Sequence, residues 1–107
     1  MKSLILVRHG EYIRNGSEGL SCSGIEAITS LGKIIAEKTK GNFYLGSSGV
    51  KRADQSAEIL KQVLAVEKSV EQIPCLDYQE RYLKGDYAEA IFKTIWGKQD
   101  MADNLIF

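Results

Sequence analysis

Apolar residues occur along the chain in short runs that alternate with segments of helical spacing. The continuous run Leu4–Val7 predicts a buried strand over residues 3–7. Two further short runs, Phe43–Leu45 and Val70–Ile73, predict a second and a third strand, the third closed by Pro74. Such alternation of strands with helices is typical of a parallel sheet built from strand–helix–strand units.

The segments between these runs carry apolar residues at steps of three and four, which predicts amphipathic helices. Ser23–Glu26 has the Ser-x-x-Glu form of a capping box and predicts a helix start, and Gly41 predicts its end. The first helical stripe consists of Ile25, Ile28, Leu31, Ile34 and Ile35, the second of Ala53, Ala57, Leu60 and Leu64, and the third of Ala88, Ile91, Phe92, Ile95 and Trp96. The third stripe is interpreted as core or as an intersubunit surface, and residues 97–107 receive no assignment.

This pattern predicts the α/β class, with a three-layer α/β/α architecture around a small, mostly parallel, three-stranded sheet. A chain of 107 residues is expected to form a single domain. Lysine plus arginine equals aspartate plus glutamate at 14 each, so charge favours neither nucleic acid nor an anionic membrane as a partner. We find no targeting or membrane-spanning segment and expect a cytoplasmic protein.

The two cysteines, Cys22 and Cys75, lack the spacing of a metal site. We interpret them as two reduced thiols, as is usual for a lone pair of cysteines in an α/β protein, with a disulfide between them as the alternative. Neither a metal nor an organic cofactor is implied by any motif in the sequence.

Arg8 and His9 follow the first predicted strand, at the edge where parallel sheets place their active sites. A neutral imidazole is a nucleophile near neutral pH, and a guanidinium holds two oxygens of a phosphate in a fork. Gly10 would let a ligand approach the backbone. The pair therefore suggests attack on a bound anion, although a solvated arginine beside a strand-end histidine is the alternative for so short a motif.

Residues 47–53 form a second cluster, between the second strand and the second helix. The N-terminus of a helix attracts anions through its free N–H groups and its dipole. Ser48 is a candidate phosphate ligand there, and Arg52 could reach the same anion as Arg8. Alternatively, Ser48 is an N-cap and Arg52 a solvated residue of the first helical turn.

Taken in order, four elements of the chain resemble the histidine phosphatase superfamily, which includes the phosphoglycerate mutases. Asn15 falls at the position of that family's phosphate-loop asparagine, while Glu26 and Gly49 stand where glutamine and proline are usual. The matching elements are Leu6–Glu11, with the Arg-His-Gly signature, Asn15, Leu20–Ala27, and Ser48–Ala57. Four elements in order are much more specific than any one of them.

The resemblance implies a phosphoglycerate mutase-like fold and phosphoryl transfer through a phosphohistidine intermediate at His9. On that pattern Arg8 and Arg52 clamp the phosphoryl oxygens, and Asn15 and Ser48 donate further hydrogen bonds. The substrate would be a phosphomonoester or phosphohistidine, carried by a small molecule or by a phosphoprotein.

A carboxylic acid usually protonates the leaving oxygen in this family. Glu80 is our candidate, because the family often carries a Leu-x-Glu element after its third strand. Asp77 and Glu11 are the competing candidates.

The chain departs from the family in having a single histidine, whereas the family carries a second one after a later strand. We therefore interpret residues 1–107 as an incomplete domain, shortened at the C-terminus, with weak or lost activity. Absence of that later strand would leave one side of the first strand unpaired, and an open edge favours self-association. The alternative is a phosphate-binding or oligomerising module without catalysis.

Overall fold

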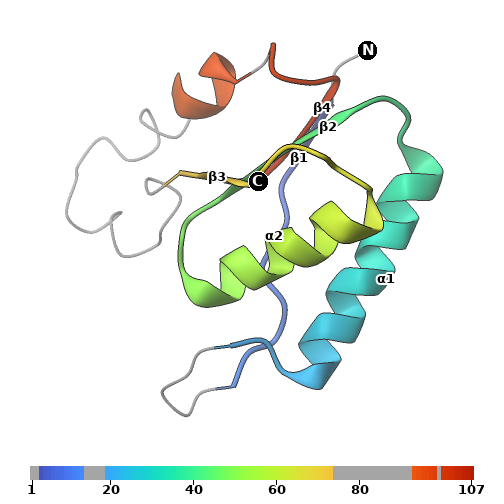
Figure 1. Ribbon diagram of the computed structural model, residues 1–107, viewed down its shortest axis with the longest axis vertical. Coiled ribbons are helices and arrows are strands. Elements are labelled where there is room, and N and C mark those ends of the chain that lie inside the picture. Colours follow the sequence, from blue (N-terminus) through green and yellow to red (C-terminus); the bar gives the residue numbers. More distant parts are fainter. Residues whose placement is uncertain (1–2, 14–18, 74–92, 99) are drawn as a thin grey trace.

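The computed structural model describes residues 3–13, 19–73, 93–98 and 100–107 (Figure 1). Within this part a four-stranded sheet has the strand order β1-β4-β2-β3, and every neighbouring pair is parallel. The sheet consists of β1 (Ser3–Ile5), β2 (Phe43–Ser47), β3 (Glu71–Gln72) and β4 (Asn104–Ile106), and the two long helices are α1 (Cys22–Lys38) and α2 (Lys51–Val63). The α/β class with a small parallel sheet is confirmed.

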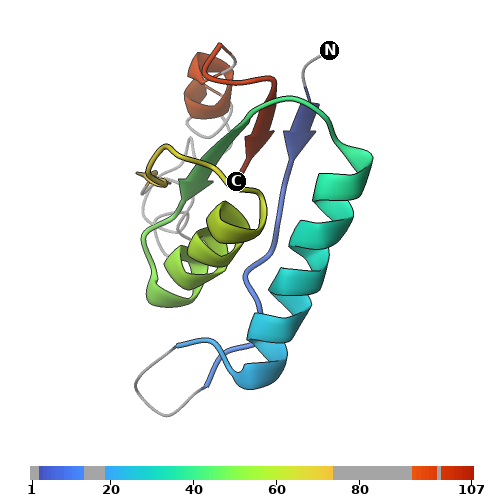
Figure 2. The same ribbon diagram turned by 45° about the vertical axis from the view of Figure 1, so that its right-hand side comes forward.

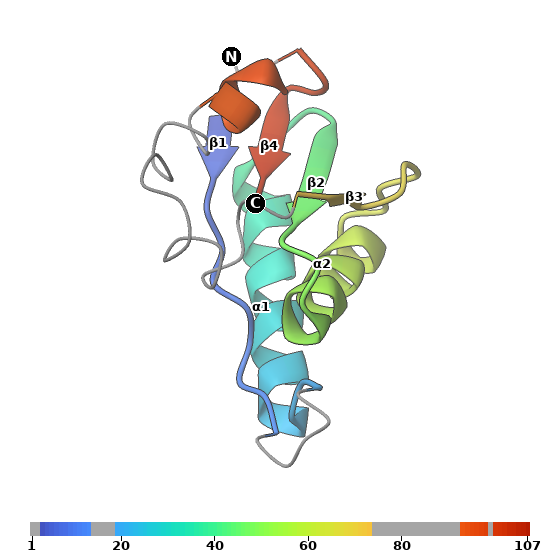
Figure 3. The same cartoon turned by 90° about the vertical axis from the view of Figure 1, so that its left-hand side faces the viewer.

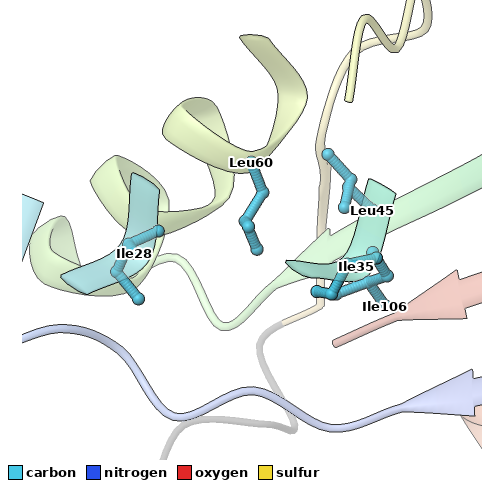
Figure 4. Close-up of a cluster of buried hydrophobic side chains, with 5 residues drawn as sticks. All are labelled: Ile28, Ile35, Leu45, Leu60 and Ile106. Carbon is cyan, nitrogen blue, oxygen red and sulfur yellow. The ribbon is translucent and has the colours of Figure 1, made fainter. Parts of the chain in front are cut away.

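Both long helices pack on the same face of the sheet (Figure 2). The connections from β1 to β2 and from β2 to β3 advance in one direction across the sheet, and right-handed crossovers then place both helices on one side. The core between helices and sheet consists of Ile28, Ile35, Leu45, Leu60 and Ile106 (Figure 4). The buried face of α1 is narrower than its sequence stripe, because Ile25 and Ile34 are 45% and 49% exposed.

Helix α1 starts earlier than the sequence predicts. Its N-cap is Ser21, whose Oγ accepts a hydrogen bond from the backbone N–H of Gly24 at 3.1 Å. The predicted capping box at Ser23–Glu26 is therefore wrong, since a serine two residues earlier already caps the helix. The helix ends at Lys38, and Gly41 lies beyond it with φ +104°, a backbone conformation that favours glycine.

The opposite face of the sheet carries a second, smaller cluster, formed by Tyr44, Ala102 and Leu105. A helical turn over residues 93–97 lies on this side of the sheet (Figure 3). Trp96 is 60% exposed, so it does not belong to the core of the described part of the chain. The remainder of the third predicted stripe, residues 88–92, lies outside the described residues.

Strand β4 was not expected, and the three-stranded sheet predicted from the sequence is wrong. Asn104–Ile106 pair with both β1 and β2, so β4 occupies the centre of the sheet. The buried Asn104 begins this strand, and its Nδ2 donates to the carbonyls of Lys40 and Asn42 at 2.9 and 3.0 Å. The apolar run Leu105–Phe107 overlaps the end of this strand, but it received no assignment although it is as long as the run Phe43–Leu45.

The first strand lies at an edge of the described sheet with one side unpaired, as the sequence predicts. Strand β4, which carries no histidine, pairs with the other side of β1 from Ser3↔Asn104 to Ile5↔Ile106, and the loss of a histidine-bearing strand from the open side stays a prediction. On its outer side β1 has no strand partner within the described ranges. Pairing of that edge with a second copy remains a prediction.

Two further expectations concern the thiols and the membrane. Cys22 is an exposed free thiol, and Cys75 lies outside the described residues. None of the helices in the described part is long and apolar enough to cross a membrane.

Candidate functional site

The carboxyl ends of three neighbouring strands meet around one pocket. Arg8 and His9 follow β1, Ser48 follows β2, and Phe107 follows β4. Backbone hydrogen bonds from Val7 N to Phe107 O (2.7 Å) and from Phe107 N to Ile5 O (3.0 Å) continue the β1–β4 pairing to the pocket. The structure thus brings the Arg-His pair and Ser48 to one place, the edge at which open parallel sheets bind ligands.

The pocket has a volume of about 180 Å³ and is lined by both polar and apolar residues. Its polar lining comes from Arg8, His9, Ser47, Ser48 and Ser56, and its apolar lining includes Leu45, Leu60, Ile106 and Phe107. Sites that enclose a whole drug-sized ligand are larger, at roughly 300–1,000 Å³. The size therefore suits one small group of a ligand.

His9 is held by hydrogen bonds at both ring nitrogens. Its Nδ1 lies 2.9 Å from the carbonyl oxygen of Gly10, and its Nε2 lies 3.1 Å from Nε of Arg52. A carbonyl oxygen can only accept and an arginine N–H can only donate. The contacts therefore select the neutral tautomer with the proton on Nδ1 and the lone pair on Nε2, facing Arg52.

Tyr12 completes this group, and the sequence analysis missed it. Its ring meets the ring of His9 edge-on, with 5.5 Å between centroids and an angle of 77°. The guanidinium carbon of Arg52 lies 4.6 Å from the centroid of the Tyr12 ring, within cation–π range. The available signal was an aromatic residue three positions after the histidine in a polar loop, which no periodicity distinguishes.

Residues in the first half of α2 form hydrogen bonds to the loops around the site. Ser56 Oγ accepts from the backbone N–H of Gly10 at 3.1 Å and donates to the carbonyl of Arg52 at 2.8 Å. Gln55 Oε1 accepts from the backbone N–H of Leu20 at 2.7 Å. Arg52, Gln55 and Ser56 all belong to the Ser48–Ala57 element, so that element both builds the site and anchors the segments that lead to it.

The start of α1 docks closely against the backbone that follows His9. A Cβ on Gly24 would lie 2.2 Å from the carbonyl oxygen of Glu11, so no side chain fits there. That same carbonyl accepts the N–H of Ser21 at 2.9 Å. The Glu11 carboxylate accepts from Ser23 Oγ at 2.5 Å, and Glu11 lines a shallow cleft with Arg8, His9, Gly10 and Tyr12.

The turn between β2 and α2 has a backbone conformation at Gly49 that favours glycine. Gly49 has φ +97°, which proline cannot adopt, and its N–H donates to Ser47 Oγ at 3.3 Å. Ser47 Oγ in turn donates to Asp54 at 2.7 Å, and Gln72 donates to the same carboxylate oxygen at 3.0 Å. The N-cap of α2 is Val50, without a side-chain hydrogen bond, so the alternative of Ser48 as N-cap is wrong.

A second polar network lies outside the pocket and joins β2, β3 and the end of the 93–98 segment. Tyr44 donates a short hydrogen bond to Glu71, and Lys98 Nζ lies 2.6 Å from Glu71 Oε1. Burial raises the pKa of the Tyr44 phenol far above its ordinary value, and the Glu71 carboxylate adds to the shift. The hydrogen bond from Lys98 lowers the pKa of Glu71, and that from Tyr44 lowers it further.

The remaining candidate residues are placed as follows. Arg8 is exposed and lines the pocket, and no described residue forms an ion pair with it. Asn15, Asp77 and Glu80 lie outside the described residues. Within the described ranges no group of three or more histidine, cysteine, aspartate or glutamate side chains could hold a metal ion.

Comparisons of the chain with protein-family models, with curated proteins and with solved structures gave no match.

Proposed function

We propose that this chain is a phosphoryl-transfer domain of the histidine phosphatase type, with a phosphoglycerate mutase-like fold and with His9 as the nucleophile. The observation that carries the proposal is the hydrogen bond between Arg52 and Nε2 of His9, which joins residues 43 positions apart in the sequence. A nucleophilic nitrogen and a cation that binds oxyanions thus meet at the carboxyl edge of a parallel sheet.

In the proposed reaction, Nε2 of His9 uses its lone pair to form a bond to phosphorus. The bond between phosphorus and the leaving oxygen breaks, and its electron pair stays on that oxygen. The ring becomes a cation that still carries the Nδ1 proton, and the Gly10 carbonyl 2.9 Å away stabilises that proton. Attack of water on phosphorus then returns the electron pair to Nε2 and releases phosphate.

The cations of the site stabilise the charge that spreads over the phosphoryl oxygens. Arg8 and Ser48 both line the pocket, and Arg52 contacts the reacting nitrogen directly. On the family pattern a second histidine shares this task, and the present sequence has one histidine. Since loss of one preorganised donor commonly costs about 100- to 1,000-fold in rate, we expect slow turnover.

The group that protonates the leaving oxygen is proposed from the family pattern, with Glu80 as first candidate and Asp77 as second. Of the three candidate acids, Glu11 is the one that lies within the described residues, and its carboxylate accepts a hydrogen bond from Ser23. An acyl phosphate needs no such proton, because carboxylate is a stable leaving group. Acetyl phosphate therefore tests the nucleophile separately from the acid.

A second function, phosphate binding without chemistry, is favoured by the same hydrogen bond. The lone pair of Nε2 accepts from Arg52, and one lone pair cannot also bond to phosphorus. If Arg52 stays in this position when an anion binds, the site holds phosphate and transfers nothing.

The test is formation of a phosphoprotein with acetyl phosphate, followed by intact mass and by acid lability, together with phosphate titration by calorimetry. We expect a single acid-labile phosphoryl group that is absent in His9→Gln and retained in Lys33→Ala, a control at an exposed position of α1. Phosphate binding without phosphorylation would instead establish the binding module. Neither binding nor phosphorylation would contradict both functions.

A further inference from the structure

Tyr12 contacts both members of the His9–Arg52 pair and belongs to no motif that the sequence analysis used. Its ring presents its face to the guanidinium of Arg52 at 4.6 Å and packs edge-on with the ring of His9 at 5.5 Å. The ring therefore contacts both the cation and the proposed nucleophile.

The backbone of Tyr12 is linked through Leu20 to the helix that carries Arg52. Tyr12 forms an antiparallel bridge with Leu20, and the adjacent Ile13 N donates to Gly19 O at 2.8 Å. The N–H of Leu20 donates to Gln55 on α2, three residues after Arg52. The hydrogen bonds that link Tyr12, Leu20 and α2 thus determine the distance between the Tyr12 ring and the Arg52 guanidinium.

The chemistry explains why this arrangement matters. Before Nε2 of His9 can be phosphorylated, the hydrogen bond from the Arg52 N–H to the lone pair of that nitrogen must break. The guanidinium must nevertheless stay close enough to contact the phosphoryl oxygens. The face of an aromatic ring attracts a cation without directional hydrogen bonds, so it permits a short displacement and opposes a long one. A leucine of comparable bulk lacks that attraction.

We propose that Tyr12 is a positioning residue, whose ring holds Arg52 beside His9 and so makes Nε2 the nitrogen that accepts the phosphoryl group. This inference rests on the proposed function for its kinetic part. Its structural part, the tautomer of His9, can be measured without any turnover.

His9 is the only histidine, so the ring-nitrogen spectrum of ¹⁵N-labelled protein contains one imidazole. At a pH about two units above the ordinary imidazole pKa of about 6.5, we expect a pyrrole-type Nδ1 and a pyridine-type Nε2. Tyr12→Phe keeps the aromatic face and should keep this pattern. Tyr12→Leu should move the two ¹⁵N signals toward one another as the second tautomer becomes populated.

The rate of phosphorylation by acetyl phosphate is the second readout. Tyr12→Leu should slow it by about 5- to 30-fold, the range of a partly desolvated cation–π contact, while Tyr12→Phe stays within about 2-fold. Ile13→Val, at the next residue, whose side chain is exposed, is the control. Tyr12→Met takes the place of Tyr12→Leu if the amide spectrum shows that the leucine variant is unfolded.

The proposal is overturned if the apolar variants leave the ring-nitrogen signals unchanged, or if Tyr12→Phe is as damaging as Tyr12→Leu. Absence of phosphorylation in the unmodified protein would contradict the proposed function, and the ring-nitrogen spectra would still decide the part played by Tyr12.

Discussion

Replacement of Ser56 by alanine should weaken both the fold and the site, because one hydroxyl joins α2 to the turn after His9. Ser56 is 4% exposed, and its Oγ accepts from the buried N–H of Gly10 at 3.1 Å. Ser56→Ala leaves that N–H without a partner, which costs about 1–3 kcal/mol. Alanine recovers a few tenths of a kcal/mol through its higher helix propensity. We therefore expect a loss of about 2 kcal/mol in the free energy of unfolding.

Equilibrium urea denaturation followed by far-ultraviolet circular dichroism measures this loss. For a domain of this size the midpoint should fall by about 1 M urea, and the melting temperature by about 10 °C. Ser30→Ala, at an exposed position of α1, is the matched control and should stay within about 0.5 kcal/mol of the unmodified protein. A Ser56→Ala variant as stable as the Ser30→Ala control would refute the reasoning.

Three further predictions address the turn, the second network and the sheet edge. Gly49→Pro should lower the free energy of unfolding by about 3 kcal/mol or more in the same urea experiment, since φ +97° is closed to proline; stability equal to that of the unmodified protein would contradict the turn geometry. The folded-state pKa of Tyr44 lies above its unfolded value of about 10, so its stabilising contribution is complete below pH 10 and is lost as the pH rises further. The free energy of unfolding should therefore fall more steeply above pH 10 in the unmodified protein than in Tyr44→Phe. If this free energy depends on pH in the same way in both proteins, the raised pKa of Tyr44 is contradicted. If the outer edge of β1 pairs with a second copy, light scattering at micromolar concentration should give a dimer mass, and a monomer mass would exclude that pairing.

The sequence allowed prediction of those parts of the fold that have a strong local pattern. The apolar run Phe43–Leu45 lies in β2, and the stripe that includes Leu60 forms the buried side of α2. The central position of β4 could not be predicted, because a run as short as Leu105–Phe107 does not indicate which strands it pairs with, and the hydrogen bonds that make Asn104 suitable for burial come from Lys40 and Asn42. Long-range contacts of this kind leave no trace in local periodicity.

The candidate site was predictable to a similar extent. Arg8, His9 and Ser48 could be placed together because parallel strands end at one edge of the sheet. The contact between Arg52 and His9 agrees with the expectation that α2 points a cation at the same place. Tyr12 could not be foreseen, because its position depends on a backbone bridge to Leu20 and on the docking of α2.

The most direct test of the account is the site at which the protein becomes phosphorylated. Protein labelled with ¹⁵N-histidine and treated with acetyl phosphate should show its phosphorus signal coupled to Nε2 of His9, and the signal should be absent in His9→Gln. The hydrogen bonds of the ring predict phosphorylation at Nε2, because Nδ1 carries the proton that is donated to the Gly10 carbonyl and Nε2 carries the lone pair. Phosphorylation at Nδ1 or at another residue, or no phosphorylation at all, would contradict His9 Nε2 as the nucleophile.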